Sequence, residues 1–426
     1  MKTILFPGRN EWQSIIKRPV ADQTRLLDSV KAILQEVKQQ GDKALKKYTQ
    51  QFDKVNLDQL EVSAEEMKAA VQSISPALRN AIETAATNIH RFHAAQTSQT
   101  EVIETMPGIK CWRKSVPIEK VGIYIPGGTA PLFSTVLMLG IPAQVAGCRE
   151  IILTSPPGEG GKIHPAILLA ARLTGVTRVF RVGGAQAIAA MAYGTETIPA
   201  VFKIFGPGNQ YVNCAKQLVQ MDAVAIDMPA GPSEVCVMAD ETCVPSFVAA
   251  DLLSQAEHGT DSQVLLVCND QQIGHDVLEE IQKQLQQLPR KNMIEETLKN
   301  SRIVVLDKLD ESIDLVNDYA PEHLIIARKD AKQVAERIVN AGSVFIGNFS
   351  PESAGDYASG TNHVLPTNQF AKNYSGVSLD SFVKKITYQQ ISRAGLEQIG
   401  QAVEEMAAAE GLEAHKNAIR IRLNYQ

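Results

Sequence analysis

A regular alternation of short apolar runs and amphipathic stretches, between residues 118 and 347, constrains the fold more than any other feature of the chain. The runs are rich in Val, Ile, Leu and Phe and have the length of strands, and helical spacing marks most of the stretches between them. Strands that alternate with helices form parallel sheets with helices on both faces. The predicted strands are KVGIYI, EIILTS, RVFRV, VFKIF, AVAID, QVLLVC, RIVVL, HLIIA and SVFIG.

Helical patterns flank this region on both sides. Residues 22–98 carry apolar side chains at helical spacing, and residues 380–426 return to helix after the strand signal ends at GTNHVLPTN. With 426 residues, the chain is longer than a single hydrophobic core usually serves. We therefore predict two Rossmann-like units rather than one large sheet, with a boundary at the turn-rich MPAGPSEV, residues 228–235.

Composition narrows the possible partners. The formal net charge is −5 and no run of Lys and Arg stands out, so we expect no binding to nucleic acid or to an anionic membrane. The longest apolar stretches are too short to span a bilayer, and MKTILFPGRNEW lacks the apolar core of a secretion signal, so we expect a cytoplasmic protein. The six cysteines include no Cys-x-x-Cys pair and are expected to be reduced and structural.

Three glycine-rich turns, YIPGGTAP, VGGAQAIAA and FGPGNQYV, follow predicted strands. Glycine lets backbone N–H groups approach a phosphate, and the N-terminus of a following helix adds a favourable field. Each turn taken alone also has a purely geometric explanation, and none has the standard Gly-x-Gly-x-x-Gly spacing. Three such turns at the ends of successive strands favour a crevice for a ligand such as a nucleotide.

The stretch LLSQAEHG places Gln255 and His258 three residues apart, which puts both on one face of a predicted helix. One interpretation is a helix end, because Gly259 suits the C′ position and a cationic histidine suits the last turn. That interpretation gives Gln255 no role. The alternative is that the two side chains form half of a metal site.

Glu322 and His323 are adjacent in YAPEHLII, directly before a predicted buried strand. Pro321 biases the preceding residue away from helix, so the pair lies in a turn. A carboxylate and an imidazole together suit successive proton transfers, although a solvated turn is an equal alternative.

Two more stretches carry ionisable side chains. The loop of residues 350–367 combines small residues with three such groups, Glu352, Asp356 and His363. A long glycine-containing loop of this kind is better suited to a site than to a core. Further along, Glu410 and His415 flank Gly411, which is expected to break the helix and let both side chains face one ligand.

Taken together, these motifs resemble one family. DMPAGPSEV, DLLSQAEHG, PEHLI, SPESAGDYASGTNHVLP and AAEGLEAHKNA, with the three glycine-rich turns, are similar to histidinol dehydrogenase, from about residue 20 to the C-terminus. The resemblance implies an α/β fold of two incomplete Rossmann-like, aldehyde-dehydrogenase-like domains with parallel sheets, a helical N-terminal segment and a helical C-terminal arm. The implied division is a first α/β domain in two pieces (1–119, with the N-terminal helices, and 236–376), an NAD-binding domain (120–235) and a C-terminal arm (377–426) exchanged in a homodimer.

The same resemblance implies the reaction. It is the zinc-dependent oxidation of L-histidinol through L-histidinal to L-histidine, the last step of histidine biosynthesis, with two NAD reduced per turnover. Each subunit would carry one zinc ion, and the C-terminal arm would complete the partner's site. Hydride transfer itself needs no redox change at the metal, which would position and neutralise the substrate.

The resemblance assigns roles residue by residue. His323 is implied as the base for the alcohol proton, and Glu322 as the group that activates water for the second oxidation. The implied zinc ligands are Gln255, His258, Asp356 and His415. The implied substrate-binding residues are Ser233, Gln255, His258, His323, Asp356, His363, Glu410 and His415. The implied NAD contacts, one from each glycine-rich turn, are Tyr124, Gln186 and Asn209.

Other reaction classes stay open on the residues alone. A zinc hydrolase could use Glu322 to activate a metal-bound water, although it would leave the glycine-rich turns unexplained. An aldehyde dehydrogenase would need one of the six cysteines as its nucleophile. A related enzyme could oxidise another amino or sulfonated alcohol, but Glu410 and His415 suit the amino and imidazole ends of histidinol.

Overall fold

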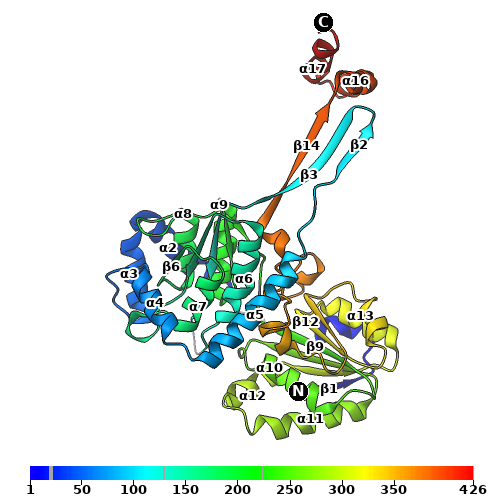
Figure 1. Ribbon diagram of the computed structural model, residues 1–426. Helices are drawn as coiled ribbons and strands as arrows, with labels where there is room; N and C mark the ends of the chain where they lie inside the picture. The colour runs from blue at the N-terminus through cyan, green and yellow to red at the C-terminus, as the bar shows by residue number, and fades with distance from the viewer. Residues whose placement is uncertain (19–22, 128–129, 223, 426) are drawn as a thin grey trace. The chain divides into compact units, whose positions relative to one another are not determined.

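The computed structural model describes residues 1–18, 23–127, 130–222 and 224–425, which divide into two compact units. The first unit consists of Met1–Ala95 and Ile118–Ser381, and the second of Gln96–Pro117 and Phe382–Gln426. Two separate parallel sheets form the first unit, and a small antiparallel sheet with two helices forms the second (Figure 1). Among the described helices, none is both long and apolar enough to cross a membrane.

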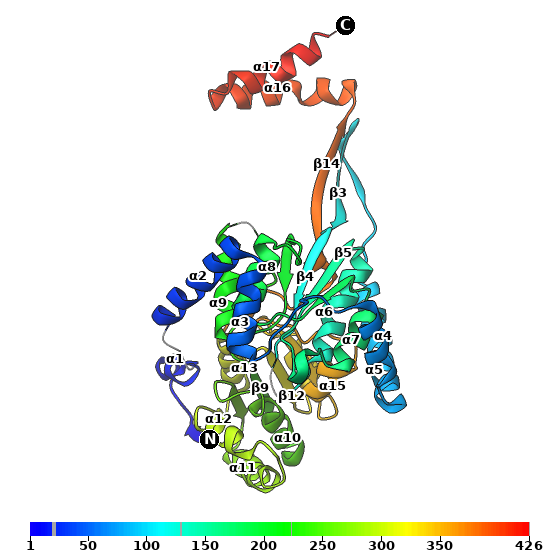
Figure 2. The ribbon, with the colours of Figure 1, turned by 90° about the vertical axis from the view of Figure 1, so that its left-hand side faces the viewer.

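A five-stranded parallel sheet occupies the middle of the first unit's sequence. Its strand order is β6-β5-β4-β7-β8, and helices cover both of its faces (Figure 2). The strands are β4 (Lys120–Tyr124), β5 (Glu150–Thr154), β6 (Arg178–Phe180), β7 (Lys203–Phe205) and β8 (Ala225–Ile226). The connecting helices are α6 (Phe133–Ala146), α7 (Pro165–Leu173), α8 (Gly184–Tyr193) and α9 (Gln210–Asp222). The strands are continuous apolar runs because helices exclude water from both faces.

The N-terminal helices pack around this sheet. Helices α2 (Gln23–Gln40) and α3 (Asp42–Asp53) lie against α8, and α2 also contacts α9. Helix α4 (Ala64–Gln72) lies against α7, and α5 (Pro76–Ala94) against α6. Ser63 caps α4 by accepting a hydrogen bond from the Glu66 N–H, and Pro76 occupies the first turn of α5.

A six-stranded parallel sheet forms the rest of the first unit, with strand order β1-β11-β10-β9-β12-β13. Its strands are β1 (Lys2–Leu5), β9 (Glu234–Ala239), β10 (Gln263–Cys268), β11 (Arg302–Val305), β12 (His323–Ala327) and β13 (Ser343–Ile346). Its helices are α1 (Trp12–Ile15), α10 (Pro245–Ala256), α11 (Gln271–Leu285), α12 (Lys291–Lys299), α13 (Leu309–Tyr319), α14 (Ala331–Ala335) and α15 (Glu352–Tyr357). Alternate side chains of β9 enter two different cores, one with α10–α12 and the other with α1, α13 and α14.

The second unit joins two segments that are far apart in the sequence. Strands β2 (Val102–Met106), β3 (Ile109–Pro117) and β14 (Val383–Ile391) form an antiparallel sheet in the order β14-β3-β2. Helices α16 (Arg393–Ala409) and α17 (Glu413–Leu423) follow, separated at Gly411, whose φ of 72° breaks the helix as predicted. Short 3-10 helices complete the chain at Arg9–Glu11, Glu159–Gly161, Phe370–Lys372 and Leu379–Phe382.

The predicted fold class and all nine predicted strands are confirmed, whereas the prediction that residues 380–426 are wholly helical is wrong. Most residues of β14 are exposed, so the strand lacks the apolar alternation that would reveal it, and its pairing with β3 holds it in place. Strands β1, β2, β3 and β9 were also not predicted. The division into domains at residues 119, 235 and 376 stays a prediction.

Candidate functional site

Glu322 and His323 lie at the amino end of β12, where the chain enters the six-stranded sheet. Ala320 ends α13 in a left-handed conformation with φ of 48°, which turns the chain ahead of Pro321. The exposed fractions of Glu322 and His323 are 6% and 4%. Burial excludes the solvated turn that the sequence left open.

The first residue of the neighbouring strand β9 contacts both side chains. The Glu234 N–H donates a hydrogen bond of 2.9 Å to Glu322 Oε2, and His323 Nδ1 lies 3.4 Å from the Glu234 carbonyl oxygen. Nδ1 also lies 3.7 Å from Glu322 Oε2 and 3.6 Å from Glu352 Oε1. We assign the Nδ1 hydrogen from these oxygens, which leaves Nε2 with the free lone pair in the neutral ring. Nε2 faces Asp356 Oδ1 at 3.5 Å.

Burial and mutual charge shift the pKa values in this cluster. Burial raises the pKa of Glu322 and that of Glu352 to about 8. Burial lowers the pKa of His323, but Glu352, Glu322 and Asp356 outweigh it and raise that pKa to about 10. Burial also favours a higher pKa for Asp356, but the neighbouring His323 holds that pKa below the usual range. Three carboxyl groups around one imidazole make a place that favours positive charge.

Gln255 lies in the last turn of α10, and His258 lies beyond the end of the helix. The prediction of one helical face that ends at Gly259 is therefore wrong, because α10 ends at Ala256 and Gly259 has no left-handed conformation. A turn takes its place, in which the His258 N–H donates to the Gln255 carbonyl oxygen at 3.3 Å. Thr297 Oγ1 holds the Gly259 carbonyl oxygen at 2.8 Å, so α12 fixes the chain that leaves α10.

Although His258 is exposed, the surrounding protein lowers its pKa, while the nearby charge of Asp356 opposes this shift. The lowered pKa favours a neutral imidazole, which is the form that binds a metal. His363 also interacts with Asp356, since its Nδ1 lies 2.7 Å from the Asp356 carbonyl oxygen. Its Nε2 lies 3.1 Å from Thr135 Oγ1, which connects the loop after α15 to helix α6.

The buried polar atoms of the site test whether it suits a metal ion. Gln255 is 1% exposed, and within the described chain neither Oε1 nor Nε2 of its side chain makes a hydrogen bond. Asp356 Oδ1 and His323 Nε2 likewise lack a hydrogen bond of acceptable geometry. Leaving a buried amide unpaired costs about 1–3 kcal/mol, so these atoms suit a ligand. Glutamine and aspartate oxygens with a histidine nitrogen fit an open zinc site.

The remaining predicted substrate residues have separate positions. Ser233 lies directly before β9 and is partly buried, and its carbonyl oxygen accepts the Gln263 N–H at 3.2 Å. Glu410 and His415 belong to the second unit, on either side of Gly411, and both are exposed. Their place beside a partner's metal site stays a prediction.

The three predicted cofactor residues line one large cavity beside the five-stranded sheet. Tyr124, Gln186 and Asn209 border a volume of about 1430 Å³ at the carboxyl ends of the strands. The Tyr124 hydroxyl accepts the Gly184 N–H at 3.2 Å, and Asn209 Oδ1 caps the start of α9 by accepting the Tyr211 N–H at 3.0 Å. Gln186 is 1% exposed and its Oε1 has no hydrogen-bond partner in the described chain.

A buried ion pair supports the third glycine-rich turn. Lys216 Nζ lies 2.5 Å from Asp227 Oδ1 and donates to the Gly206 carbonyl oxygen at 2.9 Å, while the Gly206 N–H donates to Asp227 Oδ2 at 2.8 Å. Gly206 has φ of 124°, and a Cβ at this position would collide with the Tyr124 carbonyl oxygen. The turn therefore requires glycine here.

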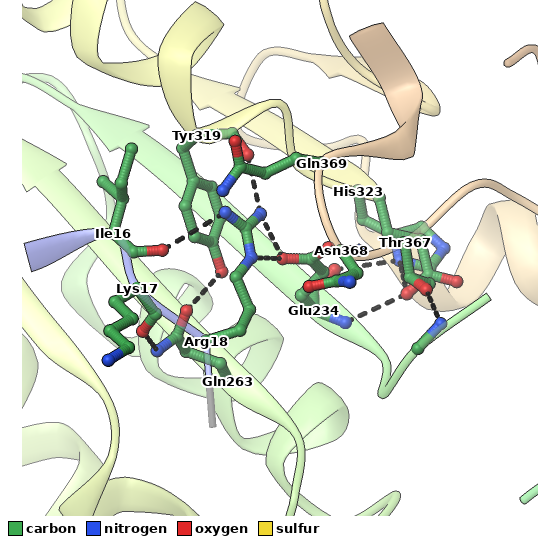
Figure 3. Close-up of polar contacts among 12 residues, drawn as sticks. Ile16, Lys17, Arg18, Glu234, Gln263, Tyr319, His323, Thr367, Asn368 and Gln369 are labelled. Carbon is green, nitrogen blue, oxygen red and sulfur yellow. Dashed lines mark hydrogen bonds and ion pairs between the residues drawn. The ribbon is translucent and has the colours of Figure 1, made fainter. Parts of the chain in front are cut away.

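Several residues of the site carried no sequence signal for their role. Glu352 was recognised only as one acid of a loop, and its contact with His323 became visible with the fold. Arg18 and Glu234 form a buried pair next to His323 (Figure 3). Glu234 is part of the DMPAGPSEV motif, which was the only available signal.

Comparisons with known proteins identify one family. The family model for histidinol dehydrogenase matches residues 16–423. Histidinol dehydrogenase of Bacteroides thetaiotaomicron is 57% identical over 424 residues, which cover 100% of this chain and 99% of that protein. The Escherichia coli O157:H7 enzyme is 48% identical over 419 residues, with 98% and 96% covered. The crystal structure of histidinol dehydrogenase from Elizabethkingia anophelis matches with a TM-score of 0.98 at 55% identity, covering 100% of this chain and 98% of that one. The chain therefore belongs to the histidinol dehydrogenase family and, with it, to the NAD-dependent dehydrogenases.

Proposed function

We propose that this protein is a zinc-dependent homodimer that oxidises L-histidinol through L-histidinal to L-histidine, with two NAD reduced per turnover. The observation that carries the proposal is the cluster of Glu322, Glu352 and Asp356 around His323, with unpaired polar atoms on Asp356 and on Gln255. The family supports the substrate and the place in histidine biosynthesis. We also propose a cytoplasmic location.

His323 acts as the base in the first oxidation through its neutral form, which is the minor form near neutral pH because the pKa of this imidazole is about 10. Its Nδ1 is surrounded by oxygens of Glu234, Glu352 and Glu322, so Nε2 is the atom that takes the alcohol proton. When bound, NAD accepts a hydride from the carbon that carries the alcohol group. The carboxylates on the far side of the ring stabilise the imidazolium that results.

Glu322 acts in the second oxidation, where water must add to the aldehyde carbon. Its buried carboxyl has a pKa of about 8, which makes its ionised form a stronger base than an ordinary carboxylate. The Glu234 N–H fixes one carboxyl oxygen, and this restricts the orientation of the group. The carboxylate takes one proton from the water as the new C–O bond forms.

The predicted zinc ligands divide between two subunits. Gln255, His258 and Asp356 would hold the ion from one subunit, and His415 from the exchanged arm of the other. Bound zinc would orient the imidazole and amino nitrogens of the substrate and reduce the charge of the carboxylate cluster. Ser233, His363 and Glu410 would complete the pocket around the substrate.

The cavity beside the five-stranded sheet suits the NAD. Helices α8 and α9 begin there, and their N-termini favour the negatively charged pyrophosphate. Tyr124, Gln186 and Asn209 each come from a different glycine-rich turn, so they would contact the cofactor from several sides.

A cysteine nucleophile is disfavoured by the state of the thiols. Burial raises the pKa of Cys148 and of Cys268 to about 12 and that of Cys243 to about 11, so few thiolates form near neutral pH. Cys236 is fully buried within β9. Replacing all six cysteines by Ala or Ser should therefore leave the chemistry largely intact.

The proposal is tested with the purified protein, L-histidinol and NAD. We expect two NADH for each histidine formed, loss of activity after chelation, and recovery when zinc is restored. No increase in NADH absorbance with zinc and NAD present would contradict it. Recovery of the activity without any metal would remove zinc from the proposal.

A further inference from the structure

A buried ion pair joins Arg18 to Glu234, the residue whose carbonyl oxygen faces His323 (Figure 3). The two side chains are 6% and 1% exposed. Arg18 donates to Glu234 Oε2 from both Nε, at 2.8 Å, and Nη2, at 2.5 Å. The pair joins the N-terminal segment to the first residue of β9, 216 positions away in the sequence.

Arg18 is fixed on its other sides as well. Nη2 also donates to the Tyr319 carbonyl oxygen at 2.6 Å, and Nη1 donates to the Ile16 carbonyl oxygen at 3.2 Å. The guanidinium stacks over the Tyr319 ring at 3.8 Å. A planar group held by stacking and by four hydrogen bonds has one orientation, which an ammonium group could not reproduce.

The backbone of Glu234, which the ion pair with Arg18 holds in place, contacts both Glu322 and His323. Its N–H holds Glu322 Oε2 at 2.9 Å, and its carbonyl oxygen faces His323 Nδ1 at 3.4 Å. A rotation of the Glu234 peptide groups would move both partners together. One backbone residue therefore restrains the orientation of the Glu322 carboxylate and helps to orient the His323 ring.

The second carboxyl oxygen of Glu234, which does not contact Arg18, binds the loop that follows α15. Glu234 Oε1 accepts the Asn368 N–H at 2.5 Å, and Thr367 Oγ1 accepts the Gly231 N–H at 2.5 Å. These two bonds attach the segment 231–234, which contains Ser233, to residues 367–368. The network thus also fixes a residue predicted to bind the substrate.

From this geometry we propose that the Arg18–Glu234 pair is a positioning device for the catalytic pair. Burying two opposite charges brings little net stability compared with apolar side chains of the same size, so stability alone does not explain the pair. Its backbone contacts with Glu322 and His323 do explain it. The inference rests on the proposed function, because its test measures histidinol oxidation.

The test compares Arg18→Lys, and the double variant Arg18→Met with Glu234→Gln, with the wild-type homodimer. Lysine keeps the positive charge but lacks the planar guanidinium that makes the four hydrogen bonds. The double variant leaves no unpaired buried charge. We expect kcat per folded molecule to fall on the order of 10²-fold in both, since about 1 Å of misplacement has that effect. The KM for NAD and the zinc content should stay within about twofold of the wild type, because neither site contacts Arg18.

Arg328→Met is the matched control. Arg328 is a partly buried arginine at the opposite ends of the same two strands, where Nε lies 2.8 Å from Asp330 Oδ1 and Nη2 lies 4.0 Å from Asp240 Oδ2. Its loss should lower thermal stability and leave kcat per folded molecule unchanged. The inference fails if the Arg18 variants behave like Arg328→Met, with lower stability and normal kcat. If the wild type itself does not reduce NAD with L-histidinol, the proposed function fails instead.

Discussion

The candidate sites of the two parallel sheets in the first unit lie at opposite ends of their strands. In the five-stranded sheet, the glycine-rich turns and the large cavity lie at the carboxyl ends of β4, β6 and β7. In the six-stranded sheet, Glu234 and His323 lie at the amino ends of β9 and β12. The usual position for a ligand in an open α/β sheet is the carboxyl edge, so the six-stranded sheet departs from the rule.

Helix polarity explains why the two edges suit different ligands. Helices α8 and α9 begin at the cavity, and the partial positive charge of a helix N-terminus favours an anion such as pyrophosphate. Helices α10 and α13 end beside the catalytic candidates, and the partial negative charge of a C-terminus favours a cation. One edge therefore favours an anion and the other a cation.

Removal of a predicted metal ligand should have the largest effect on the enzyme. His258→Asn should lose zinc and activity together, with kcat reduced by on the order of 10³-fold, because an open site tolerates the loss of one imidazole poorly. Zinc analysis and NADH formation measure the two effects. His275→Asn, an exposed histidine paired with Glu279 on α11, is the control and should change neither. Zinc content equal to the wild type would remove His258 from the ligand set.

The next largest effect should distinguish the two oxidation steps. Glu322→Gln keeps an oxygen for the Glu234 N–H but cannot take a proton, so oxidation of added L-histidinal should fall by about 10²–10⁴-fold. Hydride transfer from L-histidinol, followed in a single turnover, should fall much less. Glu241→Gln, on the surface beyond β9, controls for loss of a carboxylate. Equal losses in both steps would contradict the role in water activation.

A substitution at the carboxyl edge of the five-stranded sheet should affect only the binding of NAD. Gly206→Ala places a methyl group against the Tyr124 carbonyl oxygen and should raise the KM for NAD roughly tenfold, about 1.4 kcal/mol of binding free energy. Zinc content should not change. Gly347→Ala has a comparable φ of 87° but open space around the new methyl group, so it separates backbone strain from collision. Equal KM values in the two variants would show that the turn does not position NAD.

The smallest expected effect is on the pH dependence of the free energy of unfolding, through Asp251 on α10. Burial raises the pKa of Asp251 on α10 from 3.8 to about 7, so the folded protein binds its proton more tightly than the unfolded chain. The resulting stability is complete below pH 3.8 and is lost as the pH rises through 7. Asp251→Asn should therefore stabilise the protein at pH 8 by about 1–2 kcal/mol, and far less at pH 5. Denaturant unfolding at both values measures this, and an equal change at both would contradict it.

The sequence predicted most strands of the two sheets because they are buried on both faces and therefore read as apolar runs. It missed β9, although every residue of that strand is buried. It failed at β14, whose residues are mostly exposed and whose conformation depends on pairing with β3. Adjacency revealed Glu322 and His323, whereas Glu352 reaches His323 only through the fold. The Arg18–Glu234 pair spans 216 positions, and no local pattern signals such a contact.

The pairing of β3 with β14 also sets an order of events during synthesis. Pro117 pairs with Val383, so 266 further residues must be added before the first contact of this ladder can form. At about 5–20 residues per second, β2 and β3 wait roughly 13–53 s for their third strand. The strands of both parallel sheets are complete before that moment. The second unit, with Glu410 and His415, is therefore the last part of the molecule to fold, and a chain truncated before β14 cannot form it.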